Sequence, residues 1–330
     1  MTNKPSCSII IRAYNEEDHI GRLLTGIMEQ TNHDPEIIVV DSGSTDATVA
    51  IASRFPTKIL SITPDDFTFG RSLNLGCRAA SAEILVFASA HVYPQYPDWL
   101  DRLLEPFQDE TIGLVYGRQR GDTGTRYSEH QQFKRMFPNQ SIHNQKHPLC
   151  NNANAAIRRD LWEQHPFDES LSGLEDMDWA TWLLSQGHGL SYSADAAVVH
   201  IHNETPRQVL NRYKREAMAL ARIRPEESFG IYQFVTLYCS NILNDLRNAL
   251  ADRRLVQVFW SVLWFRWMQY LGTYLGFQHS GAVTDEVIRA FYYPEQTNTS
   301  GAAEERPVDL IDYATATRKL SKGKRDDSNS

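Results

Sequence analysis

The sequence predicts an α/β protein with a doubly wound, mainly parallel sheet and a helical extension at its carboxyl end. In the first hundred residues, short β-branched runs alternate with segments that carry apolar residues at helical spacing. This alternation is typical of parallel sheets with right-handed crossovers. We therefore expect an α/β domain over residues 1–225, an aromatic, amphipathic helical extension over 226–296 and a disordered tail over 297–330.

The composition excludes several classes of protein. The chain has 330 residues and a net charge of -8, which disfavours a nucleic-acid-binding surface. Its 4 cysteines are widely separated, so that neither a disulfide framework nor a zinc motif is indicated. Because the first residues enter a strand-like run without a leader pattern, we expect a cytoplasmic protein.

The elements of the first half follow in order along the chain. Residues 7–14 read as a buried strand, and the apolar spacing that begins at Ile20 indicates a helix. Residues 36–40 form the next strand, followed by the turn 41–46, and EILVF at 83–87 reads as a later strand. Ligands of such sheets bind beyond the carboxyl ends of the strands.

The second half is less regular. Residues 112–120 read as a strand, whereas residues 121–149 have no clear period and resemble an active-site or acceptor loop. The segment 175–187 predicts a helix that ends at a glycine, and 196–202 predicts a strand. Thr205 begins a capping box, which predicts a new helix there.

The aromatic stretch over residues 228–277 mixes Trp and Tyr with Arg. It contains no run of about 20 apolar residues, so a membrane-spanning helix is not expected. The mixture fits a helix that lies on a membrane surface. The alternative, that these aromatic residues pack against the first domain or a second subunit of a homodimer, stays open.

Polar residues at the strand ends form the candidate site. Asp41 can accept hydrogen bonds from a nucleoside, and Arg71 can face a base or a phosphate; the alternatives are helix capping and an ordinary surface arginine. No dinucleotide-binding or P-loop motif is present. The strand at 83–87 leads to Ser89, Ala90 and His91, where an acidic metal motif would be expected.

Several motifs together resemble a known family. RAYNEE, VVDSGSTDAT, PDDFTFGRSLNLG, YGRQR, NNANAAIRR, LEDMDWA and VVHIHN occur in the order seen in inverting family 2 glycosyltransferases, above all their rhamnosyltransferase branch, over residues 5–225. The resemblance implies a GT-A fold, a nucleoside-diphosphate sugar donor and inversion at the anomeric carbon. The donor-binding positions that it implies are Ala13, Tyr14, Glu16, Asp41, Ser42, Arg71, Asn74, Ser89, Ala90 and His91.

The metal motif of the family falls on Ser89-Ala90-His91, where this chain lacks both carboxylates. A leaving diphosphate needs a cation, and imidazole suits Mn²⁺, Co²⁺ or Zn²⁺ better than Mg²⁺. We therefore expect His91 and His200, and less strongly His202, to hold a divalent ion, Mn²⁺ or Mg²⁺ by analogy with the family. Direct pairing of protonated His91 with the diphosphate, and histidines without a role in the site, remain alternatives.

Asp176 is the candidate general base, because the resemblance places the base on it and a helix start favours ionised acids. Glu175 and Asp178 would orient the acceptor or the base, with Trp179 behind them, and Asn152 and Asn154 are candidates for acceptor contacts. The alternative is acidic capping of the helix alone.

The sequence thus predicts a glycosyltransferase that extends a glycan or lipid-linked acceptor in bacterial surface polysaccharide synthesis, peripherally on the inner face of the plasma membrane. The leading donor is dTDP-rhamnose. A nucleotidyltransferase and a catalytically inactive glycan-binding subunit are the alternatives.

Overall fold

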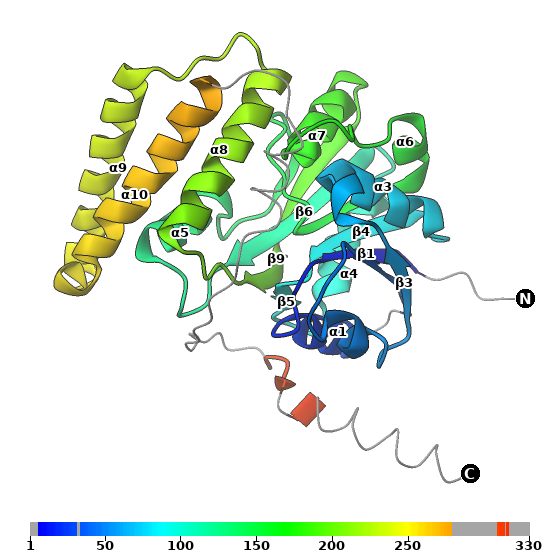
Figure 1. Cartoon of the computed structure of the whole chain (residues 1–330). Helices are drawn as coiled ribbons and strands as arrows, with labels where there is room; N and C mark the ends of the chain where they lie inside the picture. Colours follow the sequence, from blue (N-terminus) through cyan, green and yellow to red (C-terminus); the bar gives the residue numbers. More distant parts are fainter. Residues whose placement is uncertain (1–5, 32–33, 279–308, 314, 317–330) are drawn as a thin grey trace, which may run out of the picture.

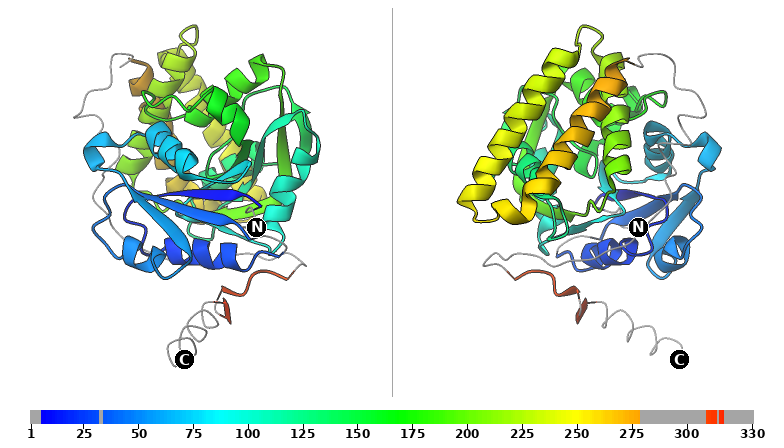
Figure 2. Two further views of the ribbon diagram at one scale, coloured as in Figure 1. Left: turned by 90° about the vertical axis from the view of Figure 1, so that its right-hand side faces the viewer. Right: turned by 60° about the vertical axis from the view of Figure 1, so that its left-hand side comes forward.

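The computed structural model describes residues 6–31, 34–278, 309–313 and 315–316. Within them, one mixed sheet with helices on both faces stands beside a group of long helices (Figures 1 and 2). The predicted α/β class is therefore confirmed, together with the helices that follow it.

The amino-terminal half of the sheet is parallel, as the alternating sequence pattern predicts. Its strands are β1 (Ser8–Ala13), β2 (Glu36–Asp41), β3 (Thr57–Ser61) and β4 (Ile84–Ser89), in the spatial order β3-β2-β1-β4. Because all four strands run the same way, the segments that follow Ala13, Asp41 and Ser89 meet at one edge of the sheet.

The other half of the sheet is mixed. β8 (Asn154–Arg158) lies antiparallel between β4 and β6 (Ile112–Arg120), and β6 runs parallel to β9 (Gly189–His200). Two short strands, β5 (Val92–Pro94) and β7 (Ile142–Gln145), pair antiparallel with β9. The pairing of Val92 with His200 brings the segment after β4 next to the end of β9.

The sheet is buried on both faces, since alternate side chains of its strands enter two different cores. Ile9 and Ile11 pack with the helices of one face, and Ile10 packs with those of the other. The first face carries α1 (Ile20–Met28), α2 (Thr48–Ala52) and α4 (Trp99–Leu104). The second carries α3 (Phe69–Ala79), α6 (Arg159–Gln164) and α7 (Glu175–Ser185).

The long helices form a bundle at one side of the sheet (Figure 2). They are α8 (Pro206–Ile223), α9 (Ile231–Ala251) and α10 (Leu255–Gln278), packed against α5 (Tyr127–Met136). The predicted capping box at Thr205 is present at the start of α8. α8 and α10 can approach closely because Gly272 and Gly276 of α10 have no Cβ atom. A Cβ atom at either position would collide with a backbone carbonyl of α8.

A buried ion pair joins α9 to α10. Arg266 donates to both carboxylate oxygens of Asp245, at 2.8 and 3.0 Å, and neither side chain is exposed to solvent. Arg266 also donates to Gln269 and to the carbonyl of Ser128 in α5. These bonds fix the two helices to each other and to α5.

Three expectations change. Residues 121–149 are not a structureless loop, because they contain α5 and β7. α8 lies within residues 1–225, the predicted α/β domain, but it packs against α10 of the predicted helical extension. The helix therefore connects the two predicted regions. The tail predicted as disordered over 297–330 contains residues 309–313, which contact α1 and β5; most of the rest lies outside the described residues.

Candidate active site

A cleft of about 530 Å³ opens at the carboxyl ends of β1 and β4 and at the end of β9. Its walls come from the segments after β1 and β2, the start of α7 and the first turns of α8. The sequence-predicted residues that line it are Ala13, Tyr14, Glu16, Ser42, Ser89, His91, Asn152, Glu175, Asp176, His200 and His202.

The loops after β1 and β2 interlock at one end of the cleft. The backbone N–H of Asn15 donates to Ser44 Oγ at 2.9 Å, and Asn15 Oδ1 accepts from the N–H of Thr45 at 2.8 Å. Asn15 therefore joins the two loops through both its backbone and its side chain. Asp41 is buried beneath this turn and accepts from the N–H groups of Gly43 and Ser44. Its carboxylate shapes the loop, and a contact with a nucleoside stays a prediction.

Several buried polar atoms of the cleft residues have no hydrogen-bond partner within the described part of the chain. Among them are the hydroxyl oxygen of Ser42 and the amide nitrogen of Asn152. Buried polar groups are nearly always satisfied in folded proteins. Both residues line the cleft, so these atoms are available to a ligand.

Three histidines meet in the cleft, and we call His91, His200 and His202 the three-histidine cluster. One ring nitrogen of each lies within 4.8 Å of those of the other two. Each Nδ1 atom lies 2.7 Å from an oxygen: Glu16 Oε1 for His91, Gln119 Oε1 for His200 and Glu129 Oε1 for His202.

The oxygen partners fix the tautomers of the cluster. An amide or carboxylate oxygen has no proton to donate, so each Nδ1 carries the hydrogen and each Nε2 is left for another ligand. The Nε2 atoms of His200 and His202 are only 2.9 Å apart. Two lone pairs cannot face each other at this distance unless a proton or a cation lies between them. The cluster therefore fits a divalent ion held by imidazoles.

The charges around the cluster favour the neutral form of His200 and the protonated form of His91. Burial lowers the pKa of His200 well below its ordinary value, and the positive fields of His202 and His91 lower it further, so His200 is neutral at pH 7. Partial burial opposes protonation of His91, but the nearby Glu16 carboxylate outweighs it and raises the pKa of His91. A neutral imidazole is the form that ligates metals.

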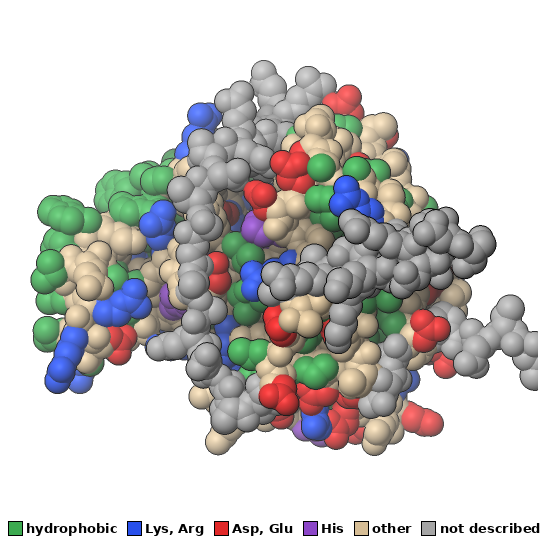
Figure 3. Space-filling model, turned by 90° about the horizontal axis from the view of Figure 1, so that it is seen from below, with side chains coloured by type: hydrophobic (Ala, Val, Ile, Leu, Met, Phe, Trp, Pro, Cys, Tyr) green, Lys and Arg blue, Asp and Glu red, His purple; other side chains and the backbone are tan. Residues whose placement is uncertain are grey.

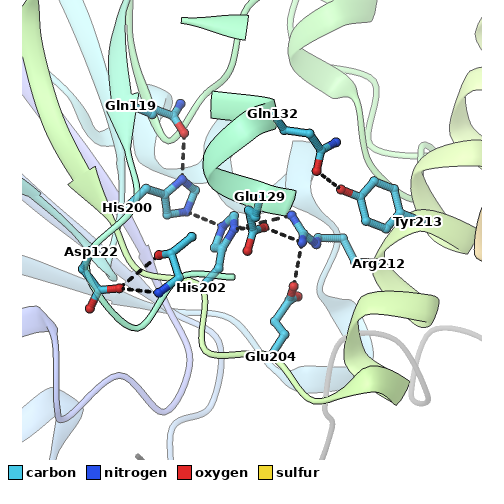
Figure 4. A network of polar contacts seen from close by, with 10 residues as sticks. Gln119, Asp122, Glu129, Gln132, His200, His202, Glu204, Arg212 and Tyr213 are labelled. Carbon is cyan, nitrogen blue, oxygen red and sulfur yellow. Dashed lines mark hydrogen bonds and ion pairs between the residues drawn. The ribbon is translucent and has the colours of Figure 1, made fainter. Parts of the chain in front are cut away.

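Glu129 ties the cluster to the helical bundle (Figure 4). It is buried, accepts from His202 and forms an ion pair with Arg212 of α8 at 2.7 Å. Although burial disfavours its charge, His202 and Arg212 together lower the pKa of Glu129 to about 2. Arg212 also pairs with Glu204 at 2.7 Å. The carboxylate that orients His202 is thus ionised at physiological pH.

Glu175 and Asp176 begin α7 at another wall of the cleft. The preceding residue, Leu174, has a left-handed backbone with φ of 57°, which turns the chain sharply into the helix. Asp176 accepts from the N–H of Asn152 at 3.1 Å and from that of Met177 at 2.8 Å. Burial, with a further contribution from Glu175, raises the pKa of Asp176 to about 7. This is the range in which a carboxylate acts well as a general base.

Some predicted site residues do not line the cleft. Asn74 and Asn154 are buried and use their amides to join distant segments, and the indole of Trp179 donates to the carbonyl of His165. Arg71 is half exposed and pairs with Asp66 at 3.3 Å. Ala90 and Asp178 are likewise absent from the lining. The fold therefore uses the side chains of Asn74, Asn154 and Trp179, whereas ligand contacts of Arg71, Ala90 and Asp178 stay predictions.

Several residues that line the cleft were not predicted from the sequence as site residues. Arg12 of β1 donates to Glu175 at 3.3 Å, and its guanidinium lies 4.6 Å from the ring centre of Phe69. Arg212 and Arg215 line the cleft from α8. Their i, i+3 spacing after the capping box was the available signal, whereas nothing in the sequence pairs Glu129 with a histidine 73 positions away.

The fold and the cleft define the class of the protein as a GT-A glycosyltransferase. Among solved structures, the chain is similar to a mannosyltransferase from Pyrobaculum calidifontis in complex with GDP-Man and Mn²⁺, with a TM-score of 0.55, 21% identity and coverage of 83% of this chain and 86% of the other. A glucosyl-3-phosphoglycerate synthase from Mycobacterium tuberculosis in complex with Mn²⁺, UDP and its product aligns with a TM-score of 0.50 and 22% identity, over 66% of this chain and 80% of the other.

The family profile described as glycosyl transferase family 2 matches residues 8–165. The O-antigen chain rhamnosyltransferase RfbN of Salmonella typhimurium is 30% identical over 62% of this chain and 69% of its own length. The rhamnosyltransferase WbaN of Salmonella anatum is 29% identical over 63% and 70%. This chain belongs to glycosyl transferase family 2, as its motifs predicted, and resembles the rhamnosyltransferases in it.

Proposed function

We propose that this protein transfers rhamnose, with inversion, from dTDP-rhamnose to a glycan or lipid-linked acceptor during the synthesis of a bacterial surface polysaccharide. The observation that carries this proposal is a buried carboxylate, Asp176, whose pKa is raised to about 7 in the same cleft as the three-histidine cluster. Two relatives named as O-antigen chain rhamnosyltransferases support the choice of sugar.

The three-histidine cluster would hold a divalent ion through its Nε2 atoms, and Mn²⁺ is the first choice because two similar solved glycosyltransferases are in complex with it. When bound, such an ion neutralises the charge that develops on the leaving diphosphate. Glu16, Gln119 and Glu129 keep the three rings oriented. His202 belongs to the same cluster as His200, although the sequence favoured it less as a metal ligand.

Asp176 would accept the proton of the acceptor hydroxyl as that oxygen attacks the sugar. The two N–H groups that contact its carboxylate hold it in place, and Glu175 keeps its pKa high. Arg12 positions Glu175 through their ion pair. The amide nitrogen of Asn152, which lacks a partner in the described part of the chain, is suited to bind the acceptor.

The helical bundle would bring the cleft to a membrane surface from the cytoplasmic side. None of the described helices has the length and apolar content needed to span a membrane. The bundle instead exposes apolar side chains, including Tyr232 (78%), Val256 (91%) and Trp260 (75%). Hydrophobic side chains are numerous on the left of Figure 3, the side on which Figure 1 shows the bundle. The exposed Arg253 and Arg254 lie at the α9–α10 turn, just before Val256 in the sequence. Apolar and basic groups together favour an anionic lipid surface.

Purified protein tests the transfer. We would incubate it with Mn²⁺, an acceptor glycolipid and each of a panel of nucleotide sugars, and determine the anomeric configuration of the product by NMR. Transfer of rhamnose with inversion supports the proposal. Transfer of a different sugar refutes the donor assignment, and donor binding without any transfer would favour the inactive glycan-binding subunit.

Flotation with anionic vesicles tests the membrane contact. Replacing both Val256 and Trp260 by Ser should reduce co-flotation several-fold, while Leu243→Ala on α9 should reduce it less. Unchanged flotation of the double variant, together with a dimer in analytical ultracentrifugation, would assign this face to a second subunit instead.

A further inference from the structure

A short C-terminal segment, residues 309–313 and 315–316, lies against α1 and β5, below them in Figure 1. The hydroxyl of Tyr313 donates to the carbonyl of Pro94 at 2.6 Å, and the N–H of Ile311 donates to the carbonyl of Gln95 at 3.2 Å. The ring of Tyr313 packs edge-on against Tyr93, with 5.3 Å between the ring centres. Backbone and side chain of the segment thus both bond to β5 and the residue after it.

The groove between α1 and β5 is shaped for this tyrosine. A Cβ atom at Gly26 of α1 would collide with the Tyr313 hydroxyl and with the ring of Pro94, so the close approach requires glycine. The guanidinium of Arg22 lies 3.8 Å from the ring centre of Tyr93 and 5.0 Å from that of Tyr313. Burial raises the pKa of Tyr313, which keeps its hydroxyl protonated as a donor. The contacts are specific to an aromatic residue with a hydroxyl group.

The two elements that the segment joins carry two partners of the proposed site. β5 starts directly after His91, and its Val92 pairs with His200. α1 follows the loop that carries Glu16, whose carboxylate accepts from His91 Nδ1 at 2.7 Å. A contact that clamps β5 to α1 therefore acts on the distance between His91 and Glu16.

We infer that the C-terminal segment is a brace that holds β5 against α1, and that Tyr313 is a positioning residue for His91. The functional meaning of this brace rests on the proposed role of His91 at the donor diphosphate.

Full-length Tyr313→Ala protein tests the brace, with Leu310→Ala as the matched control because Leu310 is exposed on the same segment. A fluorescent peptide of residues 306–318 should bind the Tyr313→Ala protein and bind the wild type at least tenfold more weakly, since the chain's own segment occupies the groove. The same peptide with Ala in place of Tyr313 should not bind. Absence of binding to the Tyr313→Ala protein would overturn the docking.

Histidine-selective NMR tests the positioning, with the His91 resonances assigned through His91→Gln. They should shift or broaden in Tyr313→Ala, recover when the peptide is added and remain unchanged in Leu310→Ala. Identical His91 resonances in wild type and Tyr313→Ala would overturn the positioning role. Neither readout uses transfer activity or a bound ion, so a failure of the brace is distinguished from a failure of the proposed function.

Discussion

Replacing Asp176 by Asn should abolish transfer and, at the same time, stabilise the protein at alkaline pH. The loss of a general base typically lowers the rate by about 10²–10⁴-fold. The stability change has a separate origin, because burial and Glu175 raise the pKa of Asp176 from 3.8 to about 7. Donor binding should persist, since the proposed donor contacts lie on other segments of the cleft.

The size of this change in the free energy of unfolding follows from the linkage between protonation and folding. One pH unit of pKa difference corresponds to about 1.4 kcal/mol, so ionised Asp176 costs the folded protein on the order of 4 kcal/mol. The folded state holds this proton more tightly than the unfolded state. The free energy of unfolding therefore falls as the pH rises from about 4 to about 7, and the whole cost is present above about pH 7. Asn removes that cost but weakens the bonds from Asn152 and Met177, so we expect a net gain of about 1–3 kcal/mol.

Thermal unfolding measures this gain. At about pH 8.5, the Tm of Asp176→Asn should exceed that of the wild type by several degrees, and the difference should shrink or reverse at about pH 4.5. Asp160→Asn, an exposed change on α6, should show no such pH dependence. A Tm difference that is the same at both pH values would refute the reasoning, and an active Asn variant would show that the base lies elsewhere.

Further predictions concern the neighbours of the site and the bundle. Glu175→Gln should move the ascending limb of the pH–rate profile to lower pH, because the charge that raises the pKa of the base is gone; an unmoved limb would contradict the coupling. Glu129→Gln should weaken Mn²⁺ binding by about 10–100-fold in calorimetric titration, and full affinity would show that the three-histidine cluster is not the ion's site. Arg266→Met should lower the free energy of unfolding by about 3–5 kcal/mol in denaturant titration, because it leaves Asp245 buried without its partner; adding Asp245→Leu should restore part of the loss.

The sequence predicts those parts of the molecule that depend on local pattern. The β-branched runs locate β1, β2 and β4, and the capping box locates the start of α8. The ends of the parallel strands β2 and β4 bring Ser42 and His91 to one cleft, because parallel strands end at a common edge, whereas Asp176 reaches the same cleft from the start of α7. These patterns predict polar side chains at one edge of the sheet, and only the family resemblance indicates that the site transfers a sugar.

The rest depends on contacts between distant segments. The pattern of β8 does not reveal that it enters the sheet antiparallel between β4 and β6. Glu129 lies in a segment without periodicity, so its bond to His202 could not be anticipated. In the sequence, Asn74 and Asn154 look like residues that contact a ligand. In the structure, their side-chain amides form hydrogen bonds within the protein. Residue type alone does not distinguish an amide that binds sugar from one that joins two loops.

The close packing of α8 on α10 restricts how this enzyme can be recombined with its relatives. α8 lines the cleft with one side and receives Gly272 and Gly276 of α10 on another. A chimera that exchanges only α9 and α10 needs glycines at these two places, or the incoming helix will push α8 into the space for the substrate. Exchange of 206–278 as one cassette avoids this conflict but imports new cleft residues. The cleft residues of α8 and the bundle are therefore inherited together.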